Sequence, residues 1–212
     1  MALGYFQQNR NEILEFIPKG CQKVLEVGCG EGVFLQSLKR SEKTLETWGL
    51  ELNPQAAKVA SQHLDHVFTG DATKLVSKLP ENYFDCIIMN DVLEHLADPE
   101  AFLLELKSKV LAKNGRIVCS IPNVRYIKNL FEFLFFKDWK YRDTGILDRT
   151  HLRFFTQKSI LRMFHGLGFH MVAMKGINPC RKIFMPFVVF LSLGFLADTR
   201  YLQYACVVEE KK

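Results

Sequence analysis

Three glycines directly after a short apolar run constrain the fold of this chain more than any other feature. Residues 24–27 are mostly apolar, as in a buried strand, and Gly28, Gly30 and Gly32 then occupy alternate positions. Apolar residues recur at helical spacing from Phe34 onward. The sequence therefore predicts a strand, a glycine turn and a helix. Such a turn lets backbone N–H groups come close to a ligand, and we expect that ligand to be a nucleotide or a nucleoside.

Two classes of nucleotide-binding protein have a turn of this kind. Gly28, Gly30 and Glu51, an acid about 20 residues later, nearly match the dinucleotide-binding fingerprint of oxidoreductases. However, Gly32 comes only two positions after the second glycine, and Glu26 lies inside the strand. A buried carboxylate is costly unless a cation or a hydrogen-bond donor meets it. These two details favour a ligand other than a dinucleotide.

The pattern Glu26-x-Gly28-x-Gly30-x-Gly32 resembles the first motif of the class I S-adenosylmethionine (SAM) dependent methyltransferases. In that family the acid faces the methionine end of the cofactor, directly or through water. The resemblance implies that SAM is the cofactor and that Glu26, Gly28, Cys29, Gly30 and Gly32 bind it. The alternative is an ordinary strand-to-helix turn beside a surface acid.

Further contacts with the cofactor are expected where the next strands end. Residues 47–51 predict a second strand, and its terminal acid, Glu51, falls where a ribose is bound at the carboxyl edge of such a sheet. After a short third strand, Asp71 corresponds to the acid that hydrogen-bonds the adenine amino group in the family that the chain resembles. A helix-capping role is the alternative for Asp71. The other residues expected to line the cofactor site are Leu52, Ala72 and Asn90.

Strands and helices alternate along the whole chain, which predicts one domain over residues 1–212. The expected fold is α/β: a doubly wound, seven-stranded, mostly parallel sheet with helices on both faces. The resemblance implies the Rossmann-like class I methyltransferase fold, in which the seventh strand inserts antiparallel beside the sixth. A helix over residues 5–17 is expected to precede the first strand and to cover the cofactor pocket.

Composition narrows the expected partners and compartment. The net charge of +5 comes from scattered Lys and Arg residues rather than from one basic run, so we expect no nucleic-acid partner. Six cysteines without C-x-x-C pairing, and an N-terminus without an apolar signal segment, predict a reduced, cytoplasmic protein. The longest uncharged apolar run, residues 183–197, is shorter than the about 20 residues that span a bilayer. We expect it to pack on the sheet, with peripheral membrane contact as the alternative.

His95 is the first candidate catalytic residue. It lies in Asp91-x-x-Glu94-His95, which is similar to the signature after the fourth strand of the ubiquinone-biosynthesis O-methyltransferases. Some of those enzymes bind a divalent metal through two acids and the histidine at matching positions. Here the first acid is Asp91, which has a shorter reach, so a metal site is left open. The alternative is that Glu94 and His95 only orient the loop over the cofactor.

His151 is the second candidate catalytic residue, in the charged and aromatic segment 145–156. Together with residues 120–125, this segment resembles the methyltransferases commonly encoded among cell-surface polysaccharide and glycan genes. The resemblance implies an acceptor site in which His151 is the base and Arg149 or Arg125 faces an acidic or phosphorylated acceptor. The alternative is a structural ion pair between Asp148 and Arg149, with His151 packed in the fold.

An aromatic insert at about 123–155 follows the fifth strand, and we expect it to form a lid over the acceptor because substrates bind at that edge.

The sequence thus predicts a SAM-dependent methyltransferase that acts on a small-molecule or glycan-related acceptor, at oxygen. The alternatives are a quinone-like phenol, a carboxylate or an amine as acceptor, or a non-catalytic SAM-binding partner protein. The identity of the acceptor and the oligomeric state are left open.

Overall fold

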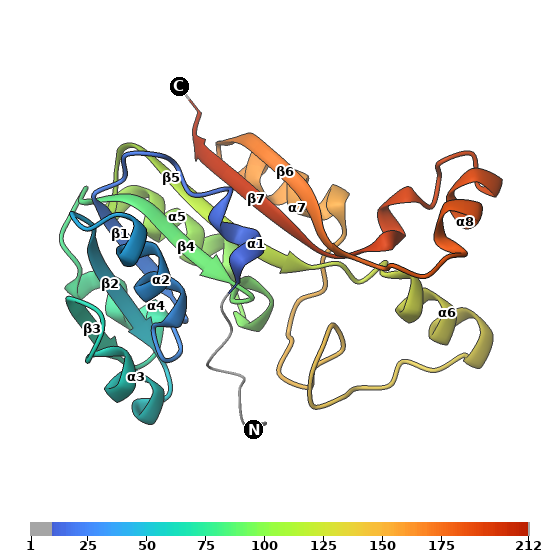
Figure 1. Ribbon diagram of the computed structural model, residues 1–212, viewed down its shortest axis with the longest axis horizontal. Helices are drawn as coiled ribbons and strands as arrows, with labels where there is room; N and C mark the ends of the chain where they lie inside the picture. The colour runs from blue at the N-terminus through green and yellow to red at the C-terminus, as the bar shows by residue number, and fades with distance from the viewer. Residues whose placement is uncertain (1–9, 212) are drawn as a thin grey trace.

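Seven strands form a single sheet in residues 10–211, which are the residues that the computed structural model describes (Figure 1). The strands are β1 (Lys23–Val27), β2 (Glu46–Glu51), β3 (His66–Thr69), β4 (Phe84–Asn90), β5 (Leu111–Pro122), β6 (Phe169–Pro179) and β7 (Tyr201–Glu210). Their order is β3-β2-β1-β4-β5-β7-β6; the neighbours from β3 to β5 pair in parallel, and β7 pairs antiparallel with both β5 and β6. The predicted mostly parallel α/β sheet is confirmed, and so is the antiparallel seventh strand beside the sixth.

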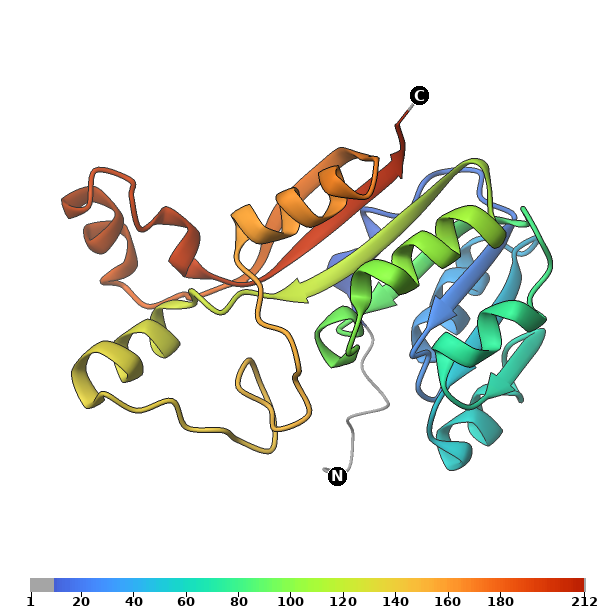
Figure 2. The same cartoon turned by 180° about the vertical axis from the view of Figure 1, so that it is seen from behind.

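Helices cover both faces of the sheet (Figures 1 and 2). The helices of the described residues are α1 (Asn11–Leu14), α2 (Val33–Ser41), α3 (Pro54–Ala60), α4 (Ala72–Leu75), α5 (Pro99–Lys109), α6 (Ile127–Phe136), α7 (Gln157–Gly166) and α8 (Met185–Leu191), with the short 3-10 helices η2 (Val76–Lys78), η3 (Leu93–His95) and η4 (Ala197–Arg200). α1, α2 and α3 pack on the face seen in Figure 1, and α4, α5 and α7 pack on the face seen in Figure 2. The predicted two-sided cover of the sheet is confirmed.

The central strand β4 shows why this sheet needs helices on both faces. Successive side chains of a strand point to opposite faces. Ile87 and Met89 accordingly belong to the apolar cluster under α5 and α7, whereas Cys86 and Ile88 belong to the cluster under α2. All four side chains are fully buried. Two apolar faces on one strand are typical of a parallel sheet, and each needs its own helical cover.

The N-terminal helix is shorter than expected. The predicted helix covers residues 5–17, and residues 5–9 lie outside the described residues. Among residues 10–17, only α1 is helical. Phe16 N–H then donates to Ile13 O, and Ile17 N–H donates to Leu14 O, which are tighter turns than those of an α-helix. The α conformation is disfavoured directly before Pro18, so the helix cannot continue.

The segment between β6 and β7 lies outside the sheet. It carries α8 and leaves the sheet beside the end of β5, where Pro122 pairs with Gln203, and α6 follows the same end of β5 (Figures 1 and 2). The expectation that residues 183–197 pack on the sheet is therefore wrong: Ile183 and Leu193 are 97% and 95% exposed. Hydrophobicity alone predicted burial, but this connection between β6 and β7 projects away from the core.

Burial of α5 against the sheet gives a direct test of the fold. Leu103 is fully buried under α5, whereas its neighbour Leu104 points to solvent and is 45% exposed. We expect Leu103→Ala to lower the free energy of unfolding by about 2–5 kcal/mol, because it removes buried methyl groups and leaves a cavity. Leu104→Ala should change it by less than about 0.5 kcal/mol. Urea denaturation measures both values, and equal losses in the two variants would contradict the packing of α5.

Candidate functional site

The carboxyl ends of three neighbouring strands bring the predicted cofactor residues to one edge of the sheet. β1 lies between β2 and β4, and Glu26, Glu51 and Asn90 lie at or next to the carboxyl ends of these strands. Ligands in sheets of this kind bind at the carboxyl edge. The structure therefore gathers these three predicted residues at the place where a nucleotide ligand is expected.

The glycine turn between β1 and α2 forms a cradle at this edge. Gly28, Gly30 and Gly32 all have positive φ values, of 73°, 55° and 78°. A Cβ atom at Gly28 would lie 2.9 Å from Cγ2 of Val92, so a side chain at this position would have to displace the segment after β4. Glycine therefore keeps the turn close to the residues that follow Asn90.

Glu51 fastens the glycine turn to the end of β2. One of its carboxylate oxygens, Oε2, accepts a hydrogen bond from Gly30 N–H at 2.8 Å, and Oε1 accepts one from Asn53 N–H, also at 2.8 Å. Asn53 in turn caps α3, as the Asn53-Pro54 sequence indicates. A carboxylate can accept about four hydrogen bonds, so Glu51 keeps the capacity to bind ribose hydroxyls. Its role at the ribose stays a prediction.

Glu26 and Asn90 leave two hydrogen-bond acceptors unused in the interior. Asn90 Nδ2 donates to Glu26 Oε1 at 3.4 Å, but within residues 10–211 neither Glu26 Oε2 nor Asn90 Oδ1 has a partner. Burial raises the pKa of Glu26 to about 8, although Asn90 and the Arg10 guanidinium act in the opposite direction. Buried acceptors without partners are costly, and a cationic donor such as an ammonium group would satisfy both. The residues present therefore fit the amino-acid end of SAM.

The remaining predicted cofactor residues differ in their surroundings. Asp71 caps α4 by accepting from Thr73 N–H at 3.0 Å and from the Thr73 hydroxyl at 2.7 Å, and the hydroxyl bond lowers the pKa of Asp71. Ala72 begins α4 and is half-buried, and Leu52 is exposed. Cys29 is buried in the glycine turn, where burial raises the pKa of its thiol. Capping is thus the role that the structure gives Asp71, and its contact with adenine stays a prediction.

Asp91 does not share a helical face with Glu94 and His95, although its spacing of three and four residues from them would allow this in a helix. It has a φ of 53°, and helical structure starts only at Leu93. Its Oδ1 accepts from Ser120 Oγ at 3.0 Å and from Gln203 Nε2 at 2.6 Å, and its Oδ2 pairs with Arg10. Asp91 thus ties together β5, β7 and the N-terminal segment.

Glu94 and His95 instead form a cluster with His151, in which one ligand atom from each residue lies within 4.8 Å of the others. The 145–153 loop reaches η3 because Leu152 and Arg153 N–H both donate to Glu94 O, at 2.8 and 3.0 Å. The two imidazole rings lie edge to face, with centroids 4.6 Å apart. The sequence indicated the two histidines separately, but nothing in it signalled that they meet.

Hydrogen bonds fix which nitrogen of each imidazole carries the proton. His151 Nδ1–H donates to Ile146 O at 2.9 Å, so the neutral ring has its lone pair on Nε2, 3.9 Å from Glu94 Oε1. The Thr150 hydroxyl donates to Asp148, so His95 Nδ1–H is left to donate to Thr150, and His95 Nε2 is unprotonated. The cluster therefore presents two basic nitrogens.

Glu94 is a buried carboxyl group without a hydrogen bond. It is 1% exposed, and among the described residues neither of its carboxyl oxygens has a hydrogen-bond partner. Burial, reinforced by the nearby Asp91 charge, raises the pKa of Glu94 well above its usual range. Burial also lowers the pKa of His95, and the neighbouring His151 adds to this effect. The cluster can therefore accept a proton or bind a cation, and its donor set of one carboxylate and two imidazoles suits a metal such as Zn²⁺.

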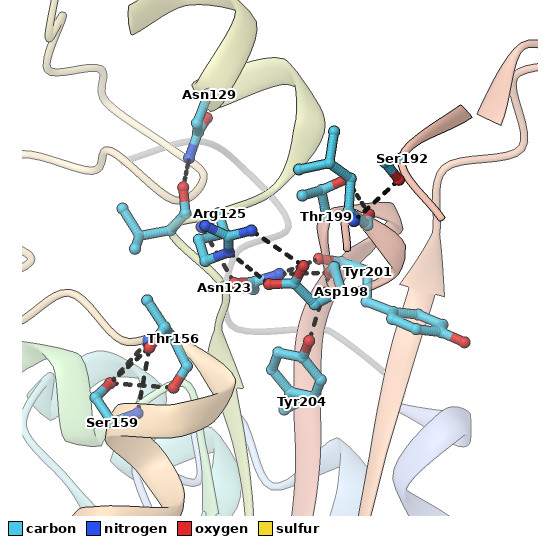
Figure 3. A network of polar contacts seen from close by, with 12 residues as sticks. Asn123, Arg125, Asn129, Thr156, Ser159, Ser192, Asp198, Thr199, Tyr201 and Tyr204 are labelled. Atoms are coloured by element: carbon cyan, nitrogen blue, oxygen red, sulfur yellow. Dashed lines mark hydrogen bonds and ion pairs between the residues drawn. The ribbon is translucent and has the colours of Figure 1, made fainter. Parts of the chain in front are cut away.

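The two candidate arginines for an acceptor lie in different environments. Arg125 forms a two-pronged ion pair with Asp198, with Nε–Oδ2 at 2.5 Å and Nη2–Oδ1 at 3.2 Å (Figure 3). Arg149 is exposed and pairs with Asp143 at 3.2 Å, not with Asp148 as the structural alternative proposed. Because Asp198 occupies the Arg125 guanidinium, Arg149 is the more accessible of the two.

Titration of Glu26 predicts how stability depends on pH. Its pKa rises from an ordinary value of 4.5 to about 8 on folding. A raised carboxyl pKa stabilises the folded state fully below the unfolded value, and this stabilisation is lost as the pH rises toward 8. The unfolding free energy of the wild type relative to Glu26→Gln should therefore fall by up to about 1.4 kcal/mol for each pH unit between these two values.

Denaturant unfolding of the cofactor-free protein at several pH values measures this difference. Glu42→Gln, at an exposed position, is the matched control and should run parallel to the wild type. A pH-independent difference between the wild type and Glu26→Gln would contradict the burial of an uncompensated carboxyl group at residue 26.

Comparison with known proteins agrees with this fold. The family model described as a methyltransferase domain matches residues 3–174. A mitochondrial ubiquinone biosynthesis O-methyltransferase of Schizosaccharomyces pombe is 35% identical over 106 residues, which cover 47% of this chain and 37% of that protein. A ubiquinone biosynthesis O-methyltransferase of Psychrobacter arcticus is 28% identical over 191 residues, which cover 84% of this chain and 71% of that protein. The matched region thus spans about a third of the length of the first relative and about two thirds of the second.

A solved structure shows the same fold. The SAM-dependent methyltransferase of Archaeoglobus fulgidus superposes with a TM-score of 0.71 at 22% identity, covering 94% of this chain and 91% of that one. The predicted Rossmann-like class I fold is therefore confirmed. Because the family model covers most of the sequence, the chain belongs to the methyltransferase domain family, with the class I fold of the SAM-dependent methyltransferases.

Proposed function

We propose that this methyltransferase transfers the methyl group of SAM to a hydroxyl oxygen of a small-molecule or glycan-related acceptor, with His151 as the base. The observation that carries the proposal is the cluster of Glu94, His95 and His151, which begins four residues after Asn90, at the same edge as the glycine turn. The cluster puts a proton acceptor next to the cofactor residues. The two relatives described above are both named as O-methyltransferases, which supports oxygen as the methylated atom.

In this proposal the cofactor residues hold SAM by its three polar parts. When bound, SAM supplies an electrophilic methyl group on a sulfonium centre. Glu26 and Asn90 accept hydrogen bonds from the ammonium group, which relieves their unpartnered oxygens. Glu51 accepts from the ribose hydroxyls while it holds Gly30 N–H. Asp71 accepts from the adenine amino group with the carboxylate capacity that capping leaves free.

His151 acts in this proposal as the base that takes the proton of the acceptor hydroxyl. Nε2 carries the lone pair because Nδ1–H is held by Ile146 O. Glu94 lies 3.9 Å from Nε2, so its carboxyl group stabilises the imidazolium once the proton has moved. Glu94 is thus a positioning residue rather than a group that contacts the acceptor.

The acceptor class is the least constrained part of the proposal. The glycan-related acceptor rests on the resemblance of residues 120–125 and 145–156 to methyltransferases of polysaccharide genes, and Arg149 is exposed beside the cluster to meet an acidic group. The lid role of the insert at about 123–155 stays a prediction; its 145–153 part contacts η3, as a cover of the acceptor would. A quinone-like phenol, a carboxylate or an amine is the alternative acceptor, and a protein that binds SAM without turnover is the alternative function.

Loss of Glu51 should weaken cofactor binding. Glu51→Ala removes the acceptor of two backbone N–H groups and of the ribose, so we expect affinity for S-adenosylhomocysteine to fall about 10- to 100-fold. Glu46→Ala, on the same strand but at its opposite end, should bind as the wild type does. Calorimetric titration of each variant with S-adenosylhomocysteine measures this affinity. A separate titration with NAD tests the alternative cofactor. Binding of NAD instead would overturn the cofactor assignment.

Loss of His151 should slow transfer without affecting the cofactor. We expect His151→Ala to lower the rate of methyl transfer about 10²- to 10⁴-fold, as removal of a general base does, with unchanged binding of S-adenosylhomocysteine. His165→Ala, an exposed histidine on α7, is the control. Transfer of labelled methyl from SAM is measured on a panel of monosaccharides, sugar nucleotides, catechols and amines.

The same assay separates a base from a metal site. If Glu94, His95 and His151 hold a metal ion, chelation by EDTA will abolish transfer and added Zn²⁺ or Mg²⁺ will restore it. If His151 is a base, transfer will survive EDTA. The assignment of His151 as the base would be wrong if His151→Ala methylated an acceptor at the same rate as the wild type.

A further inference from the structure

Two segments project from the end of the sheet and expose an unusual amount of apolar surface. α6 has no buried residue in the described part of the chain, and α8 has only Met185. The exposed large apolar residues of the two segments are Phe131, Phe133, Leu134, Phe135, Phe136, Trp139 and Tyr141 in the first, and Ile183, Phe184, Phe187, Phe190, Leu191, Leu193 and Phe195 in the second. We call this set the apolar tip. An exposed apolar surface of this extent marks an interaction site.

A network of hydrogen bonds joins the bases of the two segments (Figure 3). Asn123 Nδ2 donates to the backbone oxygens of Asp198 and Tyr201, at 2.9 and 3.0 Å, and Arg125 pairs with the Asp198 carboxylate. Cys180 N–H donates to Arg200 O at 2.7 Å and closes the second segment at its base. Residues that precede α6 are thereby fastened to residues that follow α8, so the two segments leave the sheet from one point.

The distribution of apolar residues around α6 favours a lipid over a protein groove. A helix that docks in a groove presents one stripe, at i, i+3, i+4 and i+7. Phe133, Leu134, Phe135 and Phe136 are consecutive, and at 100° per residue they cover most of the circumference of the helix. Lys128, Asn129 and Glu132 share the remaining side, so α6 has a broad apolar face and a narrow polar one, as helices that lie in a membrane interface do.

Positive charge surrounds the apolar tip. The exposed cations of the two segments are Lys128, Lys137, Lys140, Arg181, Lys182 and Arg200. Among the residues that the structure describes, none of these six takes part in an ion pair. Of the three acids in the two segments, Glu132 and Asp198 are paired with Arg142 and Arg125, so the exposed Asp138 leaves an excess of positive charge. Unpaired cations beside exposed aromatic residues are the composition of a surface that binds anionic lipid headgroups.

The length of the helices limits how deep they can reach. No helix in residues 10–211 is long and apolar enough to cross a membrane. α6 has 10 residues, and at 1.5 Å per residue it is about 15 Å long, half of the hydrocarbon thickness of a bilayer. It can therefore enter one leaflet only.

We propose that the apolar tip docks this protein on the surface of a bilayer that contains anionic lipids. The aromatic and aliphatic side chains enter the boundary between headgroups and acyl chains, and the six cations contact lipid phosphates. The surface follows from exposure, charge and the joined bases of the two segments, and it does not depend on which acceptor is methylated.

Vesicle binding tests the proposal. The full chain is sedimented with vesicles of phosphatidylcholine alone and of phosphatidylcholine mixed with phosphatidylglycerol, and Trp139, which is exposed, reports insertion by its fluorescence. We expect binding to the mixed vesicles, a blue shift of the emission, and weaker binding at high salt or without the anionic lipid.

Paired variants link binding to the apolar tip. Phe190→Ser with Leu193→Ser should weaken binding about tenfold or more, because both side chains are exposed in the free protein and buried in the bilayer. Leu161→Ser, at an exposed position on α7, is the matched control and should bind as the wild type does. Binding of S-adenosylhomocysteine by each variant shows that it is folded.

Two results would overturn the proposal. One is the absence of binding to mixed vesicles by a protein that binds S-adenosylhomocysteine. The other is a stable dimer in light scattering that the same pair of substitutions dissociates, since the apolar tip would then be an interface between two copies of this chain.

Discussion

Three carboxyl groups are buried together at one edge of the sheet, and the local structure depends on how each of them is accommodated. Glu51 has two backbone N–H donors, which it uses to hold the glycine turn against the end of β2. Within residues 10–211, Glu26 and Glu94 have no such donors, and burial raises the pKa of both. The Arg10 charge acts against this rise in pKa, but its guanidinium is paired with Asp91. The edge is therefore short of positive charge, which a cationic ligand or a proton must supply.

The fold was predictable because its signals are local. The apolar run, the alternate glycines and the following helical spacing lie within about a dozen residues, and the alternation of strands and helices leaves few topologies open. Asn53 before Pro54 also marked the start of α3 correctly. The antiparallel seventh strand followed from the family resemblance, because no local pattern specifies which edge a late strand joins.

The candidate site was only partly predictable, because its contacts connect distant segments. Glu94 and His95 were indicated by their motif, but the sequence does not tell that His151 folds back onto them through backbone bonds to Glu94 O. Asp91 does not belong to the cluster of Glu94, His95 and His151. Its positive φ directs its side chain toward Ser120 and Gln203 instead. The packing of residues 183–197 on the sheet was predicted wrongly for a related reason. An apolar run does not reveal whether the chain leaves the sheet at that point.

The first residues of β7 connect the site with the base of the apolar tip. Gln203, the third residue of this strand, donates to Asp91 next to the site. Asn123 donates to the backbone oxygens of Asp198 and Tyr201, immediately before it (Figure 3). So short a connection couples the orientation of the two projecting segments to that of the carboxyl edge.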